Sequence, residues 1–173
     1  MIAIIQYNAG NILSVYNAID RLGYDCIITN DHKKIKDADK VIFPGVGEAF
    51  SAMKYLRFNK LDKLIQNLEQ PVLGICLGMQ LMCNSSEEGP TQCLKIFPND
   101  VVRFKNNDLV PHMGWNNFES ADTKLLKGVK ISDDLYYVHS YYVEVGKSTT
   151  AICNYQINFS SIIENENFFG TQF

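Results

Sequence analysis

The sequence has no cluster of basic residues, no long apolar run and no C-x-x-C pair. Its 16 Lys and Arg residues against 19 Asp and Glu residues leave a net charge of −3, which argues against a nucleic-acid partner or an anionic membrane surface. No apolar run approaches the ~20 residues that a membrane-spanning helix needs. The five cysteines are odd in number and have no ligand spacing with histidine, so we expect no metal, no cofactor and no disulfide framework.

The start of the chain also lacks the features of a secretory leader. The segment Met1–Ile5 is too short and uncharged for one, and its apolar run is typical of a core strand. Together with the absence of a disulfide framework, this predicts a cytoplasmic protein with reduced thiols. A long linker, a low-complexity tract and an internal repeat are missing as well, so we expect one domain over residues 1–173.

What the first half does contain is an alternation of apolar strands and amphipathic helices. We expect strands at Met1–Ile5, Cys26–Thr29, Val41–Phe43 and Val72–Ile75, and helices around residues 12–22, 50–56 and 61–68, with a short surface helix within 30–40. Asn11 is placed to cap the first helix and Gly23 to end it. Alternation with short turns predicts an α/β fold: a mostly parallel central sheet covered by helices on both faces.

The second half has a different texture. We expect additional short antiparallel strands there, at Lys95–Phe97, Val101–Phe104, Leu135–Val145, Ala151–Tyr155, Phe159–Ile163 and Phe168–Phe173.

The stretch Gly74-Ile75-Cys76-Leu77-Gly78 carries the strongest chemical signal. Glycines two residues on either side of a cysteine, after a buried strand, have the spacing of a nucleophile elbow with Cys in place of Ser. A helix that starts after Cys76 would point its free N–H groups at the sulfur, favour the thiolate and aim the Leu77 N–H at a developing oxyanion. The alternative interpretation is a small buried cysteine at a glycine-rich strand end.

The Pro44-Gly45-Val46-Gly47 turn follows another predicted strand of the same sheet. Parallel sheets bind ligands at the carboxyl ends of their strands, and both this turn and Cys76 lie at such ends. The two segments therefore predict one shared site.

Several motifs together resemble those of the triad (class I) glutamine amidotransferases, and among them the glutaminase subunits of imidazole glycerol phosphate synthases. They occur in the family's order over almost the whole chain: Gly10-Asn11, PGVG at 44–47, GICLGMQ at 74–80, SSEEG at 85–89, PHMGWN at 111–116 and VHSY at 138–141.

The resemblance implies that Cys76 attacks the side-chain amide of L-glutamine, forming a glutamyl thioester and releasing ammonia. The oxyanion would be held by the N–H groups of Leu77 and Val46. The positions that match the family's substrate contacts are Gly47, Gln80, Glu88, Ser140 and Tyr141.

The resemblance also implies a partner. PHMGWN would lie on a face that docks on a (β/α)8-barrel cyclase subunit, forming a heterodimer for histidine biosynthesis. The interface residues implied are Asn11, Met113, Trp115 and Tyr137. Enrichment of Met and aromatic residues at interfaces is consistent with this. The other interpretation is a core Trp115, with His112 bonded to neighbouring backbone.

Two departures from the family pattern remain. Gln6 stands where the family usually carries Asp, and Asn8-Ala9 where it has more glycine. In the family, the strand ending GTQF is followed at once by a His-Pro-Glu segment that supplies the triad base, whereas Phe173 is the last residue here. We therefore expect the C-terminal end of the domain to be missing and these 173 residues to be poorly active.

Three other functions stay open at this point. A paralogous glutaminase could supply ammonia to a sugar amidotransferase, and a chain that truly ends at Phe173 could be a non-catalytic binding subunit. A stress or chaperone-type protein with a cysteine elbow is the third, and Gln80, Glu88 and PHMGWN argue against it.

Overall fold

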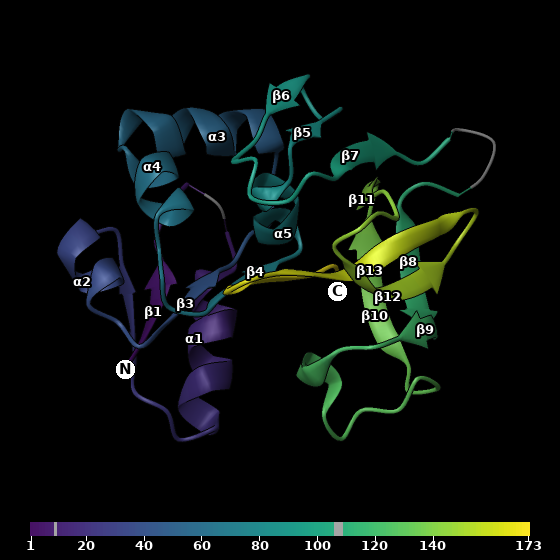
Figure 1. Cartoon of the computed structure of the whole chain (residues 1–173), viewed down its shortest axis with the longest axis horizontal. Coiled ribbons are helices and arrows are strands. Elements are labelled where there is room, and N and C mark those ends of the chain that lie inside the picture. The colour runs from purple at the N-terminus through teal and green to yellow at the C-terminus, as the bar shows by residue number, and fades with distance from the viewer. Residues whose placement is uncertain (9, 106–108) are drawn as a thin grey trace.

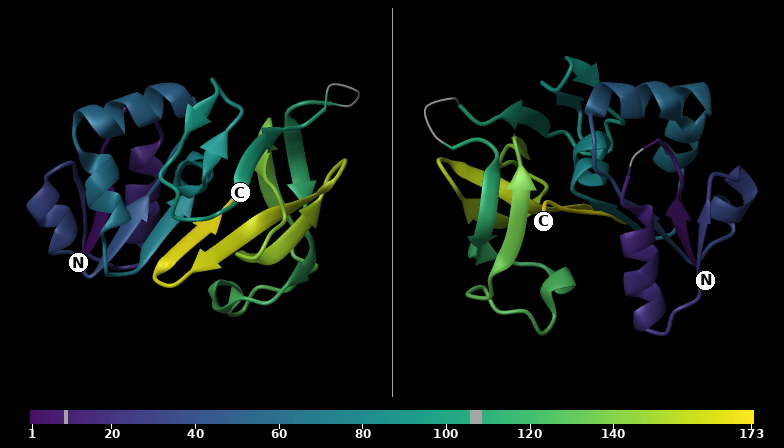
Figure 2. Two further views of the ribbon diagram at one scale, coloured as in Figure 1. Left: turned by 45° about the horizontal axis from the view of Figure 1, so that its top comes forward. Right: turned by 180° about the vertical axis from the view of Figure 1, so that it is seen from behind.

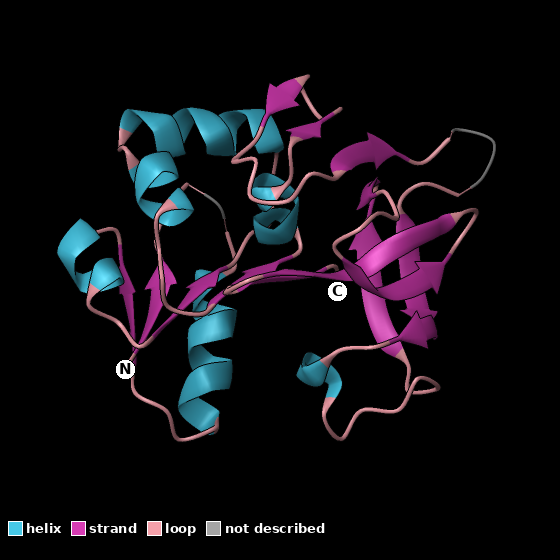
Figure 3. Cartoon of the chain, viewed as in Figure 1, coloured by secondary structure: helices cyan, strands magenta, loops and turns pink. Residues whose placement is uncertain are grey.

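The computed structural model describes residues 1–8, 10–105 and 109–173. Ala9, in the turn where the sequence differs from the family pattern, therefore lies outside the described residues. A sheet with helices occupies one half of the molecule and a strand-rich region the other (Figure 3). The helices are α1 (Ile12–Arg21), α2 (His32–Lys36), α3 (Ala49–Phe58), α4 (Leu61–Gln66), α5 (Leu77–Met82) and the short 3₁₀ turn η1 (Lys124–Leu126).

The strands of the first half are β1 (Ile2–Ile5), β2 (Cys26–Thr29), β3 (Lys40–Phe43) and β4 (Val72–Ile75). Those of the second are β5 (Ser85–Ser86), β6 (Thr91–Gln92), β7 (Asp100–Arg103), β8 (His112–Asn116), β9 (Phe118–Ala121), β10 (Leu135–His139), β11 (Tyr141–Val143), β12 (Thr149–Asn154), β13 (Asn158–Asn165) and β14 (Phe168–Thr171).

The main sheet runs in the order β2-β1-β3-β4-β14-β13-β11-β7-β5-β6. Its first five strands are parallel, and β13, β11 and β7 continue it in antiparallel pairs. Helix α1 lies on one face of the parallel part and α3, α4 and α5 on the other, as Figures 1 and 2 show. The predicted fold class is confirmed.

The last strand of the described chain is an interior strand of this sheet. β14 pairs in parallel with β4 and in antiparallel with β13, so it joins the parallel half to the antiparallel half. Phe173 follows it and packs against Phe118 and Tyr137, with ring centroids 6.2 and 6.0 Å apart.

Strands β8 and β10 form a separate two-stranded antiparallel ribbon, which pairs Trp115 with Tyr136 and Met113 with Val138. The predicted strand Leu135–Val145 is therefore two strands in two sheets, β10 and β11, with Ser140 at the bend between them.

Two predictions about local structure were wrong. Lys95–Phe97 is not a strand, because the N–H groups of Lys95, Ile96 and Phe97 donate to carbonyls of Met82 and Cys83 at the end of α5. Asn11 precedes α1 but makes no side-chain cap, because its backbone is left-handed, with φ of 68°. Gly23, with φ of 77°, follows the end of α1 as expected.

The helices of the described residues are too short to cross a membrane, the longest having ten residues.

Candidate active site

Cys76 lies on a strained turn between β4 and α5. Its φ of 52° and ψ of −112° are unusual for a non-glycine residue, and its N–H donates to the Thr171 carbonyl of β14 at 2.7 Å. The backbone bond to the neighbouring strand holds the turn in this conformation, so the sulfur stands at the carboxyl end of the sheet.

The glycines that flank Cys76 are required by close contact between α5 and the sheet. A Cβ on Gly78 would lie 1.8 Å from the Phe43 carbonyl oxygen, and one on Gly74 would lie 2.8 Å from the Met79 nitrogen. Either side chain would push α5 off the strands. The elbow that the spacing predicts is confirmed in its geometry.

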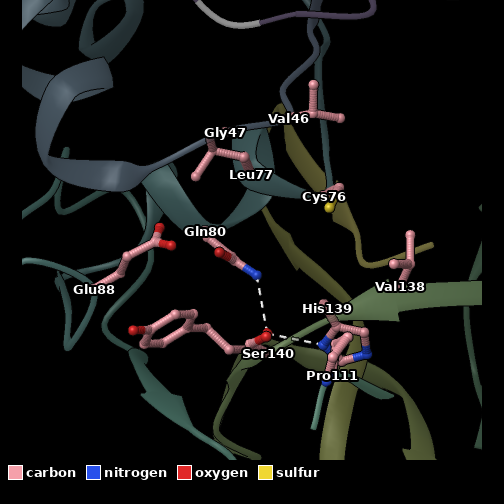
Figure 4. Close-up of a pocket in the computed structure, with 11 residues that line it drawn as sticks. Val46, Gly47, Cys76, Leu77, Gln80, Glu88, Pro111, Val138, His139 and Ser140 are labelled. Carbon is pink, nitrogen blue, oxygen red and sulfur yellow. Dashed lines mark hydrogen bonds between the residues drawn. The ribbon is translucent and has the colours of Figure 1, made fainter. Parts of the chain in front are cut away.

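A cleft of about 400 Å³ opens beside the sulfur (Figure 4). All eight residues predicted for catalysis and substrate binding line it: Val46, Gly47, Cys76, Leu77, Gln80, Glu88, Ser140 and Tyr141. Three further residues complete the wall, namely Pro111, Val138 and His139. The volume is in the range of small-molecule sites.

Of the two predicted oxyanion donors, the Leu77 N–H has a backbone partner, whereas at Val46 the carbonyl and not the N–H makes the hydrogen bond. The Leu77 N–H donates to the Gly45 carbonyl at 3.3 Å, and the Val46 carbonyl accepts from the Gly10 N–H at 3.4 Å. The Leu77 N–H therefore lies beside the cleft as expected, and the Gly45 carbonyl holds it in this structure.

Burial raises the pKa of the Cys76 thiol, and the nearby Glu88 carboxylate raises it further. Hydrogen bonds from the Leu77 N–H and the Gln172 side chain oppose this shift. The expectation that the helix end would favour the thiolate is wrong in net direction, because the desolvation of the sulfur outweighs these donors. A thiol of this kind needs a proton acceptor to become a nucleophile.

Gln80 and Glu88 lie in the cleft wall with part of their bonding capacity used by the protein. The Gln80 Nε2 donates to the Tyr141 carbonyl at 3.1 Å and to the Gln172 Oε1 at 2.7 Å. Glu88 Oε2 accepts from the Ala49 N–H at 2.8 Å, at the start of α3. Burial raises the pKa of Glu88.

None of the three histidines directs a ring nitrogen at Cys76 among the hydrogen bonds of the described residues. His32 is bonded to the Asn59 carbonyl beside α2. His139 lines the cleft, but its Nδ1 donates to the Tyr141 carbonyl at 2.8 Å and its Nε2 faces the Nδ1 of His112 at 3.0 Å. The polar side chain bonded to the sulfur is Gln172, through Nε2 at 3.5 Å.

Three of the four residues predicted for the interface lie on the β8–β10 ribbon: Met113, Trp115 and Tyr137. Met113 and Trp115 are exposed, at 61% and 71%, and lie on its outer face. Tyr137 is fully buried and its hydroxyl bonds to Ser161 Oγ at 2.7 Å, so its assignment to the interface was wrong. Its neighbour Tyr136 is the exposed tyrosine, because successive strand residues point to opposite faces.

Val138 is exposed on the outer face of the ribbon and also lines the cleft beside Cys76. Asn11 is exposed next to Gly10, whose N–H contacts the Val46 carbonyl at the cleft. We call Met113, Trp115, Tyr136 and Val138 the apolar ribbon face; it reaches the mouth of the cleft through Val138.

His139 and Gln172 are site residues that sequence reasoning did not assign. His139 lies in VHSY and lines the cleft with Cys76. Gln172 follows β14, and the pairing of β14 with β4 brings it to Cys76. No three His, Cys, Asp or Glu side chains gather to hold a metal ion in residues 1–8, 10–105 and 109–173.

Known proteins that resemble this chain do so over nearly its full length. The sequence model described as Glutamine amidotransferase class-I matches residues 3–173. Proteins named imidazole glycerol phosphate synthase subunit HisH are similar: that of Bacteroides thetaiotaomicron is 51% identical over 99% of this chain and 89% of its own length. That of Haemophilus influenzae is 47% identical over 99% of this chain and 87% of its own length.

Solved structures share the fold at low sequence identity. A glutamine amidotransferase crystal structure superposes with a TM-score of 0.75 at 14% identity, covering 98% of this chain and 87% of that one. The glutaminase domain of Trypanosoma brucei CTPS with bound acivicin gives 0.64 at 17% identity, covering 99% and 84%. With a match over residues 3–173, the chain belongs to the class-I glutamine amidotransferase family.

Proposed function

We propose that this chain is the glutaminase subunit of an imidazole glycerol phosphate synthase, acting in histidine biosynthesis in the cytoplasm. The observation that carries the proposal is the convergence of Cys76 and seven further predicted residues on one cleft. The relatives named as this subunit, at 51% and 47% identity, support the choice of enzyme.

In this reaction, Cys76 Sγ attacks the side-chain amide carbon of L-glutamine. Ammonia leaves, a glutamyl thioester forms, and water hydrolyses the thioester to glutamate and restores the thiol. The raised pKa of Cys76 means that the proton must pass to a base as the sulfur attacks.

Substrate recognition follows from the charges around the cleft. The Glu88 carboxylate is the acidic side chain of the cleft wall and is suited to the α-ammonium group of glutamine. Gly47, Ser140 and Tyr141 also line the cleft and offer backbone groups to the substrate. Gly47 has φ of 127°, a conformation that glycine adopts without the strain that a Cβ would cause.

The oxyanion needs the Leu77 N–H, which Gly45 holds in this structure at 3.3 Å. The proposal therefore includes a rearrangement of the PGVG turn, with the Gly45 carbonyl turning away and the Val46 N–H turning toward the cleft. Losing one oxyanion donor typically costs about 10²–10³ in rate, so the resting arrangement is expected to be slow.

The partner of this chain, in our proposal, is a (β/α)8-barrel cyclase subunit that forms a heterodimer through the apolar ribbon face. Exposed apolar residues gathered on one ribbon are typical of a docking surface. Because Val138 joins this face to the cleft, a partner seated there would receive ammonia without its passage through bulk water.

Ammonia release from glutamine tests the proposal. The purified chain, a Cys76→Ala variant and a chain that continues past Phe173 with the family's His-Pro-Glu segment would be assayed with and without the cyclase. We expect the extended chain with cyclase to be fastest. Residues 1–173 should be about 10⁴-fold slower, because Cys76 has no histidine partner among the described contacts.

Two outcomes would count against the proposal. If the extended chain with cyclase releases no more ammonia than Cys76→Ala, the protein is not a glutaminase and a non-catalytic binding subunit becomes the better description. If residues 1–173 match the extended chain, the proton acceptor lies within them and the assignment of the base fails.

A further inference from the structure

A continuous series of hydrogen bonds connects the ribbon to the catalytic sulfur. It begins with Asn116 Nδ2 and His112 Nε2, 3.4 Å apart, and continues from His112 Nδ1 to His139 Nε2 at 3.0 Å. His139 Nδ1 then contacts the Tyr141 carbonyl at 2.8 Å.

The second part of the series starts at the same carbonyl. Gln80 Nε2 donates to it at 3.1 Å and also donates to Gln172 Oε1 at 2.7 Å, and Gln172 Nε2 donates to Cys76 Sγ at 3.5 Å. Figure 4 draws the two bonds to the Tyr141 carbonyl, from His139 and Gln80, as dashed lines.

The Tyr141 carbonyl can only accept a hydrogen bond, and this fixes the donor and acceptor in each of the three histidine contacts. His139 must therefore carry a proton on Nδ1, and in a neutral ring its Nε2 is then an acceptor. His112 must in turn donate from Nδ1, which leaves its Nε2 to accept from the Asn116 amide. One tautomer of each ring satisfies all three contacts.

Both rings are buried, at 3% and 6% exposure, and they are held by aromatic side chains. The His112 ring stacks on Tyr155 with centroids 4.0 Å apart and on Tyr137 at 5.0 Å. Burial lowers the pKa of each histidine to about 4, so both rings are neutral at pH 7, as the tautomer assignment requires.

We propose that His112 and His139 are positioning residues that fix the Tyr141 carbonyl, and that this carbonyl, through Gln80 and Gln172, sets the amide group that faces the Cys76 sulfur. His139 acts at the bend between β10 and β11, where Ser140 and Tyr141 line the cleft. With the carbonyl held, Gln80 presents Nε2 to it and to Gln172 Oε1, so that Gln172 must present Nε2 to the sulfur.

The inference deepens the proposed function, on which its kinetic test rests. Two substitutions at one position separate the two ring nitrogens. In His139→Asn the amide nitrogen can take the place of Nδ1 and keep the bond to the Tyr141 carbonyl. In His139→Gln the amide oxygen reaches the place of Nε2 and keeps the bond from His112, but the Tyr141 carbonyl loses its donor.

Glutamine turnover by the catalytically competent extended chain with cyclase is the first readout. We expect kcat of His139→Gln to fall about 10- to 100-fold with little change in KM, whereas His139→Asn stays within about threefold of the parent. The rate at which iodoacetamide alkylates Cys76 should likewise change more in His139→Gln than in His139→Asn. A merely structural role would make both properties follow the melting temperatures of the two variants instead.

Equal kcat values for the two variants, measured well below both melting temperatures, would overturn the inference. Should a variant not fold, the histidine side-chain ¹⁵N signals of the unmodified chain at pH 7 provide a second test. Both rings must be neutral with the proton on Nδ1, and either ring charged or protonated on Nε2 would overturn it. Failure of the unmodified complex to release ammonia would reject the proposed function but leave this NMR result unaffected.

Discussion

The two faces of the β8–β10 ribbon differ in burial, and the more polar face is the buried one. One face buries His112, Tyr137 and His139 in a part of the hydrophobic core that contains Phe104 and Phe159. The other face exposes Met113, Trp115, Tyr136 and Val138. Hydrophobicity alone would bury the exposed face first, so what separates the two faces is strand register and the packing of β8 and β10 on β13.

The buried face should make the stability of the fold sensitive to mild acid. The pKa of each ribbon histidine is about 4 in the folded chain and about 6.5 when unfolded, so between these values the unfolded chain binds protons that the folded chain does not. Stability is therefore lost as pH falls from about 6.5 to 4. We expect a loss of roughly 2 kcal/mol per histidine between pH 7 and pH 5.

Urea unfolding at the two pH values measures this loss. The control is a variant with both His112→Asn and His139→Asn, whose stability should depend much less on pH over the same interval. An equal dependence in both proteins would show that other groups cause the loss and that the buried pair does not.

The exposed face should affect binding and leave stability unchanged. Trp115→Ala should weaken association with the cyclase by about 2 kcal/mol, as the loss of an aromatic anchor does. It should leave the fold intact, because the Trp115 side chain is exposed and its ring lies against Tyr136, which is itself exposed. Isothermal titration gives the dissociation constant, and the melting temperature of the free chain should stay within about 1 °C. A large drop in melting temperature with unchanged affinity would instead assign Trp115 to the core.

The smallest effect is expected at Tyr137, which the sequence assigned to the interface and the structure buries. Tyr137→Phe removes the hydroxyl bonded to Ser161 and should destabilise the chain by about 1 kcal/mol, leaving its affinity for the cyclase unchanged. Tyr136→Phe is the matched control, with little effect on stability. A loss of affinity in Tyr137→Phe comparable to that of Trp115→Ala would restore Tyr137 to the interface.

The sequence was most informative where backbone conformation demands one residue type. Gly74 and Gly78 flank Cys76 because α5 lies against the Phe43 carbonyl, and this requirement is visible as spacing. The parallel sheet followed from the local alternation of strands and helices. The substrate-contact residues of the cleft followed instead from the resemblance to the amidotransferase family, since no local pattern marks them.

Properties that depend on distant segments could not be predicted. The raised pKa of the Cys76 thiol depends on the burial of its sulfur in the folded chain, and the bond from Gln172 to Cys76 depends on β14 pairing with β4. Tyr137 was misassigned because a one-residue difference along a strand reverses the face, and no local signal marks which face is covered. Lys95–Phe97 has strand-like composition, yet its backbone completes the end of α5.

The interior position of β14 also has a consequence for the order in which the molecule can form. Gln172 lies 96 residues after Cys76, yet β14 must enter between β4 and β13 before the elbow has its backbone partner Thr171. During synthesis, the two halves of the sheet stay separate until β14 has left the ribosome, because β14 is the strand that joins them. Contacts between segments so far apart in sequence form slowly compared with local helices. We therefore expect the Cys76 turn to reach its final conformation late in folding, after the rest of the sheet has formed.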